Sequence, residues 1–293
     1  MGKQMIKIII ILSICLAGAL FLLWSNKSLV TTGHTLQCKD LPSAFDGFTI
    51  TQVSDLQSAT FGERQEALLE KVRESNPDII VITGDLVDRN HTDYQASLTA
   101  AKGLVDIAPV YYVNGNHELS LPVVEIEDFY DQLREMGVTV LFDAGEEIVR
   151  EKDQSIFIVG LSEERIYASK ADQTKRDSDY DASVIEGAVE RITENLAEDS
   201  FSIMLVHEPQ YLEQYAGHGI DLIFAGHAHG GQIRLPFTDG LYAPGQGILP
   251  KMTSGVHEQK DTRMVISRGL GNSVFPFRVF NRPEVVTVTL KGE

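Results

Sequence analysis

The chain has 293 residues, 43% of them hydrophobic, and a formal net charge of −17, so it can bury a sizeable core. This composition excludes collagenous, disordered and disulfide-rich classes, and the length fits one large domain or two small ones. The negative charge would repel polyanions, so no nucleic-acid partner is expected.

The amino-terminal segment contains an uncharged apolar run from Ile8 to Trp24, preceded by Lys3 and Lys7. As a helix this run would be about 25 Å long, near the lower limit for crossing a bilayer. A cleaved signal peptide has the same basic start and apolar middle, and it remains the alternative. No clear small-residue cleavage site follows, and Trp24 suits a membrane interface, which favours a retained anchor within residues 1–30. The lysines predict a cytoplasmic amino terminus, hence a single-pass protein of the cell membrane with an extracytoplasmic domain.

Residues 31–47 are expected to form a connector, and residues 48–293 the folded domain. Within that domain, 48–231 carries the chemical motifs and 232–293 supplies carboxy-terminal strands. Cys38 has no disulfide partner in the soluble part, because the other cysteine lies inside the apolar run.

Strand and helix signals alternate at the start of the domain. Elements of the order β-α-β-α-β are expected over residues 48–53, 63–75, 78–85, 94–106 and 110–118. The third of these is a continuous apolar run, typical of a strand buried on both faces. The order predicts a sheet with helices packed against it.

The rest of the chain continues this pattern less regularly. Helices are expected over 125–137 and 184–196, and strands over 138–142, 155–161, 201–209, 221–231, 262–269 and 284–290. The polar segment from Ser162 to Asp181 is expected to be a surface loop or a mobile lid.

Five polar clusters each follow directly on an apolar strand. They occupy residues 54–57, 84–85, 115–118, 207–208 and 226–229. Carboxyl ends of strands are where α/β proteins build their sites, and the glycines in three clusters allow tight turns. Each residue alone could be a turn or cap residue, but Asp, Asn and His together without thiolate indicate a site for a divalent metal.

The clusters read Asp55-Leu56-Gln57, Gly84-Asp85, Gly115-Asn116-His117-Glu118, His207 and Gly226-His227-Ala228-His229. In this order they resemble the signature of the calcineurin-like metallophosphoesterases, which is Asp-x-His, Gly-Asp, Gly-Asn-His-Glu/Asp, His and Gly-His-x-His. The resemblance covers roughly 48–231. The sequence around His207 and after His229 looks most like the membrane-associated bacterial branch, some of whose members act on lipid-linked phosphates.

The resemblance implies an α/β fold, a four-layer double β-sandwich flanked by helices, here preceded by a transmembrane helix. It implies two divalent metal ions, with manganese favoured and iron, zinc, cobalt or magnesium as alternatives. The first metal would be surrounded by Asp55, Gln57, Asp85 and His229. The second would be surrounded by Asp85, Asn116, His207 and His227, with Asp85 as the bridge.

The expected activity is hydrolysis of phosphoester or phosphoanhydride bonds, with hydroxide generated from water between two metals. The expected partner is a phosphorylated substrate, with lipid-linked phosphates as candidates. His117 would protonate the leaving oxygen, because imidazole titrates near neutrality; a ligand-orienting hydrogen bond is the alternative role. Glu118 is expected either to orient a neighbour or to be solvated.

Gln57 departs from the family pattern, which has histidine at this position. Glutamine can offer a metal only its amide oxygen, or bind it through water. Some branches that act on phosphoanhydrides also carry glutamine here, so catalysis remains the leading hypothesis. The alternative is a catalytically weakened metal-binding scaffold or sensor at the cell envelope.

The substrate-binding residues are not identified by the sequence. Arg89 and Asn90 follow the second motif and are candidates for contacting a phosphate, as is Arg268 from the tail. Three aromatic residues in the tail are candidates for lipid contact or for core packing: Phe275, Phe277 and Phe280.

Overall fold

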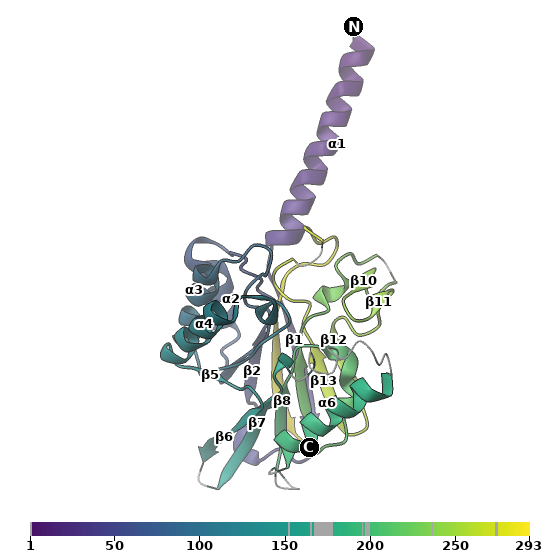
Figure 1. Ribbon diagram of the computed structural model, residues 1–293. Coiled ribbons are helices and arrows are strands. Elements are labelled where there is room, and N and C mark those ends of the chain that lie inside the picture. Colours follow the sequence, from purple (N-terminus) through teal and green to yellow (C-terminus); the bar gives the residue numbers. More distant parts are fainter. Residues whose placement is uncertain are drawn as a thin grey trace.

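A long amino-terminal helix, α1 (Gly2–Lys27), stands apart from the rest of the chain in the computed structural model (Figure 1). The structure describes residues 2–151, 153–164, 166, 178–194, 196, 200–235, 237–272 and 275–293. Residues Lys3–Lys27 are long and apolar enough to cross a membrane, and the most apolar stretch of this helix is 0% buried. A signal sequence meets the same criteria, so anchor and signal both remain compatible with the helix.

The remaining chain forms two mixed six-stranded sheets. The first has the order β1 (Val30–Cys38), β14 (Glu284–Gly292), β2 (Thr49–Val53), β3 (Ile79–Thr83), β4 (Val110–Val113) and β5 (Val138–Val140). The second has the order β12 (Gly255–Gln259), β13 (Thr262–Ile266), β9 (Leu222–Ala225), β8 (Ser202–Leu205), β7 (Gln154–Gly160) and β6 (Ala144–Glu151). Strands are parallel except at β14–β2, β12–β13 and β6–β7.

Helices cover the outer face of each sheet, and the inner faces pack on one another. The first sheet is covered by α2 (Glu66–Glu74), α3 (Tyr94–Val105) and α4 (Val123–Glu135). The second is covered by α6 (Ser178–Thr193) and α7 (Leu212–Tyr215). Ile79 and Val81 of β3 pack between the sheets, whereas Ile80 and Ile82 pack under the helices. This α/β/β/α arrangement confirms the four-layer sandwich.

Smaller elements lie in the connections. They are the short hairpin β10 (Tyr242–Ala243) and β11 (Gly247–Ile248), and the single-turn 3₁₀ helices η1 (Ser43–Phe45), η2 (Glu63–Gln65), η3 (Glu118–Ser120), η4 (Pro209–Tyr211) and η5 (His229–Gly231).

Three segments differ from the sequence-based expectations. Residues 31–47 are not an irregular connector throughout, because β1 pairs with β14 along its whole length. Strand β6 was not predicted, because its charged and largely exposed sequence lacks an apolar alternation. The predicted loop or lid over Ser162–Asp181 lies mostly outside the described residues. In its described part, Ser162 and Glu163 are buried, and α6 begins earlier than expected.

The carboxyl ends of the strands from both sheets meet at one edge. Strands β2, β3 and β4 run parallel in the first sheet, and β8 and β9 run parallel in the second. Gln52 of β2 donates to the Ala225 carbonyl at the end of β9, with 2.8 Å between nitrogen and oxygen. The loops after these five strands therefore share one location.

Candidate metal centre

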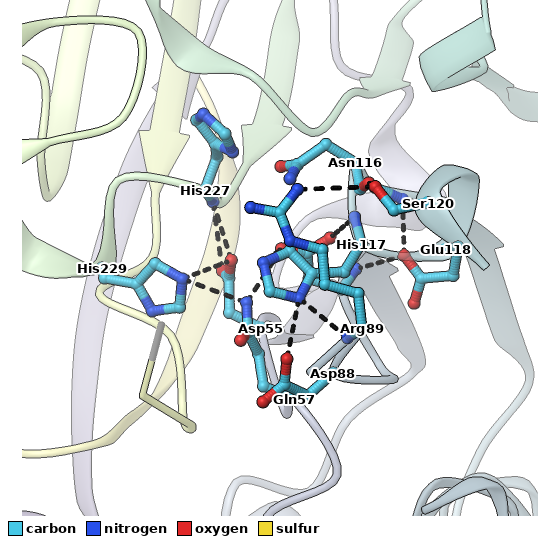
Figure 2. A network of polar contacts seen from close by, with 12 residues as sticks. Asp55, Gln57, Asp88, Arg89, Asn116, His117, Glu118, Ser120, His227 and His229 are labelled. Carbon is cyan, nitrogen blue, oxygen red and sulfur yellow. Dashed lines mark hydrogen bonds and ion pairs between the residues drawn. The ribbon is translucent and has the colours of Figure 1, made fainter. Parts of the chain in front are cut away.

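The five strand-end clusters converge, as the sequence predicted. Of the seven predicted ligands, only Asn116 is partly exposed. The other six are buried: Asp55, Gln57, Asp85, His207, His227 and His229. Figure 2 shows Asp55, Gln57 and His229 facing one another, with Asn116 and His117 on the neighbouring loop. Ligand atoms of Asp55, Asp85 and His207 all lie within 4.8 Å of one another, which makes them a candidate metal-binding triad.

The second predicted set surrounds Nε2 of His207. This nitrogen lies 3.4 Å from Asp85 Oδ2, 3.3 Å from Asn116 Oδ1 and 3.1 Å from His227 Nδ1. The other ring nitrogen, Nδ1, donates to the Thr83 carbonyl at 2.7 Å, because a carbonyl can only accept. In a neutral ring that bond places the proton on Nδ1 and leaves the Nε2 lone pair to a metal. Burial lowers the pKa of His207, but the neighbouring Asp85 carboxylate raises it further, so without metal the net shift is upward.

The first predicted set surrounds Nε2 of His229. This nitrogen lies 3.4 Å from Asp55 Oδ1 and 3.3 Å from Gln57 Nε2. Gln57 Nε2 also donates to Asp85 Oδ2 at 2.9 Å. The amide of Gln57 thus lies between Asp85, the predicted bridging residue, and His229, which is the place expected for a ligand.

Two contacts make the first set different from the second. Gln57 presents its amide nitrogen, which cannot bind a metal, while its buried Oε1 has no hydrogen-bond partner in the described part of the chain. A half-turn of the amide would bring that oxygen to the ligand position. The guanidinium of Arg278 lies 3.3 Å from His229 Nδ1, so a positive charge stands next to the imidazole of this set. An amide oxygen is a weaker ligand than an imidazole nitrogen, and a neighbouring cation opposes a bound metal ion, so both features weaken this set as a metal site.

The electrostatics of the site favour a bound cation. Burial raises the pKa of Asp55 to about 6, and burial together with the charge of Asp85 raises the pKa of Glu118 to about 8. Crowded buried carboxylates are unfavourable unless a cation lies among them. Burial and the neighbouring Arg278 lower the pKa of His229, so its ring is neutral. Oxygen and imidazole donors in this arrangement fit a divalent metal ion.

The backbone at the site is held in an unusual conformation. Positive φ angles occur at several predicted ligands, namely Asp55 (51°), Gln57 (50°), Asp85 (53°), His227 (66°) and His229 (46°). Residues other than glycine avoid this region at a cost of order 1 kcal/mol each, and such strain is concentrated at functional sites. At Gly226, a Cβ would lie 2.5 Å from Asp55 Oδ2 and collide with Ser54 Oγ. Glycine there lets the two loops approach.

His117 lies next to the predicted ligands with one nitrogen facing them. Its Nε2 is 3.9 Å from Asp85 Oδ2, and its Nδ1 is 3.2 Å from Asp88 Oδ1 (Figure 2). Nδ1 accepts a hydrogen bond from the Arg89 backbone amide at 3.2 Å, which orients the ring and leaves the proton of a neutral imidazole on Nε2, as required of a proton donor. Asp88 was not predicted as a site residue, although it stands three residues after Asp85 in the same loop.

Glu118 is buried and not solvated. Its Oε2 accepts from the Asp85 and Gly115 amides at 3.0 and 2.9 Å, and its Oε1 accepts from the Val87 amide at 3.1 Å. Glu118 therefore holds the loops that carry Asp85 and Asn116 in register.

The basic residues near the site only partly match the expectations. Arg89 is exposed beside His117, and its backbone amide lies 3.2 Å from His117 Nδ1 (Figure 2). Arg268 is engaged by Glu284, with its Nε 2.8 Å from Oε2. The tail instead brings Arg278, which was not predicted as a site residue, to within 3.3 Å of His229 Nδ1.

The family model and the three relatives described next are all named as phosphoesterases, phosphodiesterases or metallophosphoesterases. The family model for calcineurin-like phosphoesterases matches residues 48–231. The uncharacterized metallophosphoesterase YkuE of Bacillus subtilis is 31% identical over 266 residues, which cover 89% of this chain and 85% of that protein. Phosphodiesterase YaeI of Escherichia coli is 24% identical over 218 residues, covering 74% of this chain and 72% of that protein. A transmembrane protein with a metallophosphoesterase domain from Danio rerio is 24% identical over 261 residues, covering 86% and 55%.

Proposed function

The chain belongs to the calcineurin-like phosphoesterase family, and from this premise we propose that it is a membrane-anchored hydrolase of phosphoester or phosphoanhydride bonds that uses two metal ions. The observation that carries the proposal is the convergence of the donor atoms around His207 Nε2. We divide the chain into an anchor, residues 1–30, and a catalytic domain, residues 48–293, with residues 31–47 adding an edge strand.

The metal-binding roles follow the two sets of donor atoms. Asp85, Asn116, His207 and His227 would hold one ion, and Asp55, Gln57, Asp85 and His229 the other. When bound, divalent ions would lower the pKa of water and offset the charge of the phosphate. Because Gln57 and Arg278 weaken the set around His229, we propose that its ion binds less tightly. Manganese accepts mixed oxygen and nitrogen donors and is the ion we favour.

Side chains near the metal centre would donate the proton to the leaving oxygen and hold the phosphate and Asp85 in position. His117 would give a proton from Nε2 to the leaving oxygen, while the Arg89 backbone amide donates to Nδ1 and the Asp88 carboxylate lies beside it. Arg89, exposed at the edge of the site, would contact a phosphate oxygen through its guanidinium. Glu118 keeps Asp85 in place through backbone hydrogen bonds.

The location follows from α1. Lys3 and Lys7 precede the apolar run and support a cytoplasmic amino terminus, and in that orientation the catalytic domain would lie outside. A domain tethered to the bilayer in this way has access to lipid-linked phosphates, which we propose as its substrates.

The test uses the full-length chain in detergent, stripped of metal and reloaded with manganese, iron, zinc, cobalt or magnesium. Hydrolysis of soluble phosphomonoesters, phosphodiesters, pyrophosphates and lipid phosphates is then measured. The proposal predicts metal-dependent turnover that Asp85→Asn abolishes. The matched control Asp131→Asn removes an exposed carboxylate, 70% accessible, and leaves turnover unchanged. Metal binding without turnover of any substrate would favour the scaffold or sensor instead.

A further inference from the structure

The carboxyl end of α1 is attached directly to the loops that build the metal centre. Asn26 accepts from the Arg278 amide at 2.7 Å and donates to the Arg278 carbonyl at 3.2 Å. The side chain of Arg278 in turn contacts His229. Lys27 donates to the Thr60 carbonyl at 3.1 Å, in the loop that follows Gln57. The metal centre therefore lies at the end of the domain from which α1 projects.

Further contacts fix the direction of α1 relative to the domain. Arg282 donates to the Ser28 and Leu29 carbonyls at 2.9 and 3.0 Å, and its guanidinium lies 4.9 Å from the centre of the Trp24 ring. Ser25 is completely buried at the same junction. Because the helix end is held by these contacts, the direction of α1 is fixed relative to the domain, and a membrane crossed by α1 would lie on this side of it.

Exposed apolar side chains occur on the tail and on the segment from Leu235 to Leu249, and one of them, Phe280, contacts α1. We call them the apolar rim: Leu235, Phe237, Ile248, Leu249, Phe275, Phe277 and Phe280. Phe237 is fully exposed and Ile248 is 81% exposed. The three tail aromatics are thus not core residues.

The segments that carry the rim are joined to one another and to the metal centre. Ile233 pairs with Val279, and the Leu249 amide donates to the Leu241 carbonyl at 3.0 Å. The Leu241 amide donates at 3.0 Å to the carbonyl of Gly231, at the end of the turn that begins with His229. Figure 1 shows β10 and β11, which belong to this region, on the side of the domain near α1. The rim and the centre therefore share one end of the molecule.

The depth of the rim can be inferred from one aromatic contact. Phe280 packs on Phe21 of α1, with ring centres 5.0 Å apart. Phe21 precedes Trp24 by three residues, so it lies about 4.5 Å further along the apolar span. Tryptophan marks the membrane interface, so Phe280 lies at the level of the last apolar turn of the helix.

We propose that the apolar rim inserts into the interface of the bilayer that α1 crosses and holds the metal centre against the lipid surface. Large contiguous apolar patches are rare on soluble surfaces and mark contact with membranes or proteins. A bilayer is favoured here because the rim adjoins an apolar helix that is itself uncovered. The inference rests on the proposed membrane anchoring, and it deepens the proposed function by presenting the site to phosphates carried by lipids.

Insertion is tested with spin labels in the full-length chain in nanodiscs that hold one copy each, with Cys15→Ala and Cys38→Ser as background. Labels at Phe237→Cys and Ile248→Cys are expected to collide with oxygen more than with a water-soluble nickel reagent. The control Val149→Cys, on β6 at the end of the domain away from α1, shows the reverse (Figure 1). Equal behaviour at all three positions would overturn the proposal. So would rim labels shielded from both reagents, as expected for a rim covered by protein.

The consequence for catalysis is tested separately with vesicles of phosphatidylcholine containing a minor fraction of phosphatidic acid. The double variant Phe237→Ser, Ile248→Ser should hydrolyse the lipid phosphate about a hundredfold more slowly, since burying each such side chain is worth about tenfold. Turnover of a soluble phosphomonoester stays unchanged, as it does for Val149→Ser. If the double variant hydrolyses the lipid phosphate at the wild-type rate, the proposed insertion of the apolar rim is wrong but the proposed function stands. If the wild-type chain hydrolyses neither substrate, the proposed function itself is wrong.

Discussion

Replacing Asp55 with asparagine should change the stability of the protein in opposite directions with and without metal. Asp55 is completely buried, and burial raises its pKa from the ordinary 3.8 to about 6. A raised pKa means that the folded state holds the proton of Asp55 more tightly than the unfolded chain does, so ionising this buried carboxyl costs stability. In the metal-free protein, the contribution of Asp55 to stability is therefore present below about pH 4 and lost as pH rises through about 6.

The size of the effect follows from the shift. A difference of about two pKa units corresponds to roughly 3 kcal/mol of destabilisation at pH 7.5, or about 5 °C or more in Tm. Asparagine carries no charge and keeps an oxygen to accept from Ser54 and His227, which donate to Asp55 at 2.6 and 3.1 Å. Without metal, Asp55→Asn should therefore unfold at a higher temperature than the wild type.

Saturating metal should reverse this order. A ligand at a hundred times its Kd stabilises the folded state by about 2.7 kcal/mol, and the variant lacks the carboxylate that contributes to this binding. The assay is thermal unfolding of the full-length chain in detergent between pH 4 and 8, with chelator or with manganese. A metal-free variant that is less stable than the wild type at every pH would refute the reasoning.

Three further substitutions test individual side chains. His117→Ala should lower kcat by about 10²- to 10⁴-fold with metal affinity unchanged, and Asp88→Asn should lower it less; an unchanged rate would remove His117 as the acid. Gln57→His should tighten the weaker of two metal-binding steps in calorimetry, and identical isotherms would show that residue 57 does not bind metal. Gly226→Ala should destabilise the chain by about 1–3 kcal/mol through overpacking against Ser54, and an unfolding midpoint equal to that of the wild type would contradict the close approach of the two loops.

The fold could be predicted largely from local patterns, and the failures occurred where pairing is distant in sequence. The apolar run of β3 identified a strand buried on both faces, and the helices beside it had clear apolar spacing. Strand β1 is polar and pairs with β14 at the opposite end of the chain, so nothing local distinguishes it from a connector. The charged edge strand β6 was not predicted either, because its sequence has no apolar alternation that distinguishes it from a loop.

The site could be predicted to the extent that its residues follow strands that end at one edge. That rule placed His207 and Asp85 together before the fold was known. Asp88 was missed although its position in the loop after Asp85 carried a signal. Arg278 could not be foreseen, because the tail reaches His229 through contacts that no spacing reveals. For the same reason Arg268 was predicted as a candidate for contacting a phosphate, whereas in the structure it pairs with Glu284.

The most direct test of the account is a titration in which metal content and turnover are measured on the same sample. The full-length chain is stripped with chelator and loaded stepwise with manganese, and bound metal is quantified by elemental analysis. We expect no turnover without metal, a tightly bound first equivalent, and turnover that rises as the second equivalent binds. Turnover that persists after complete removal of metal, or two bound ions with no hydrolysis of any phosphate substrate, would contradict it.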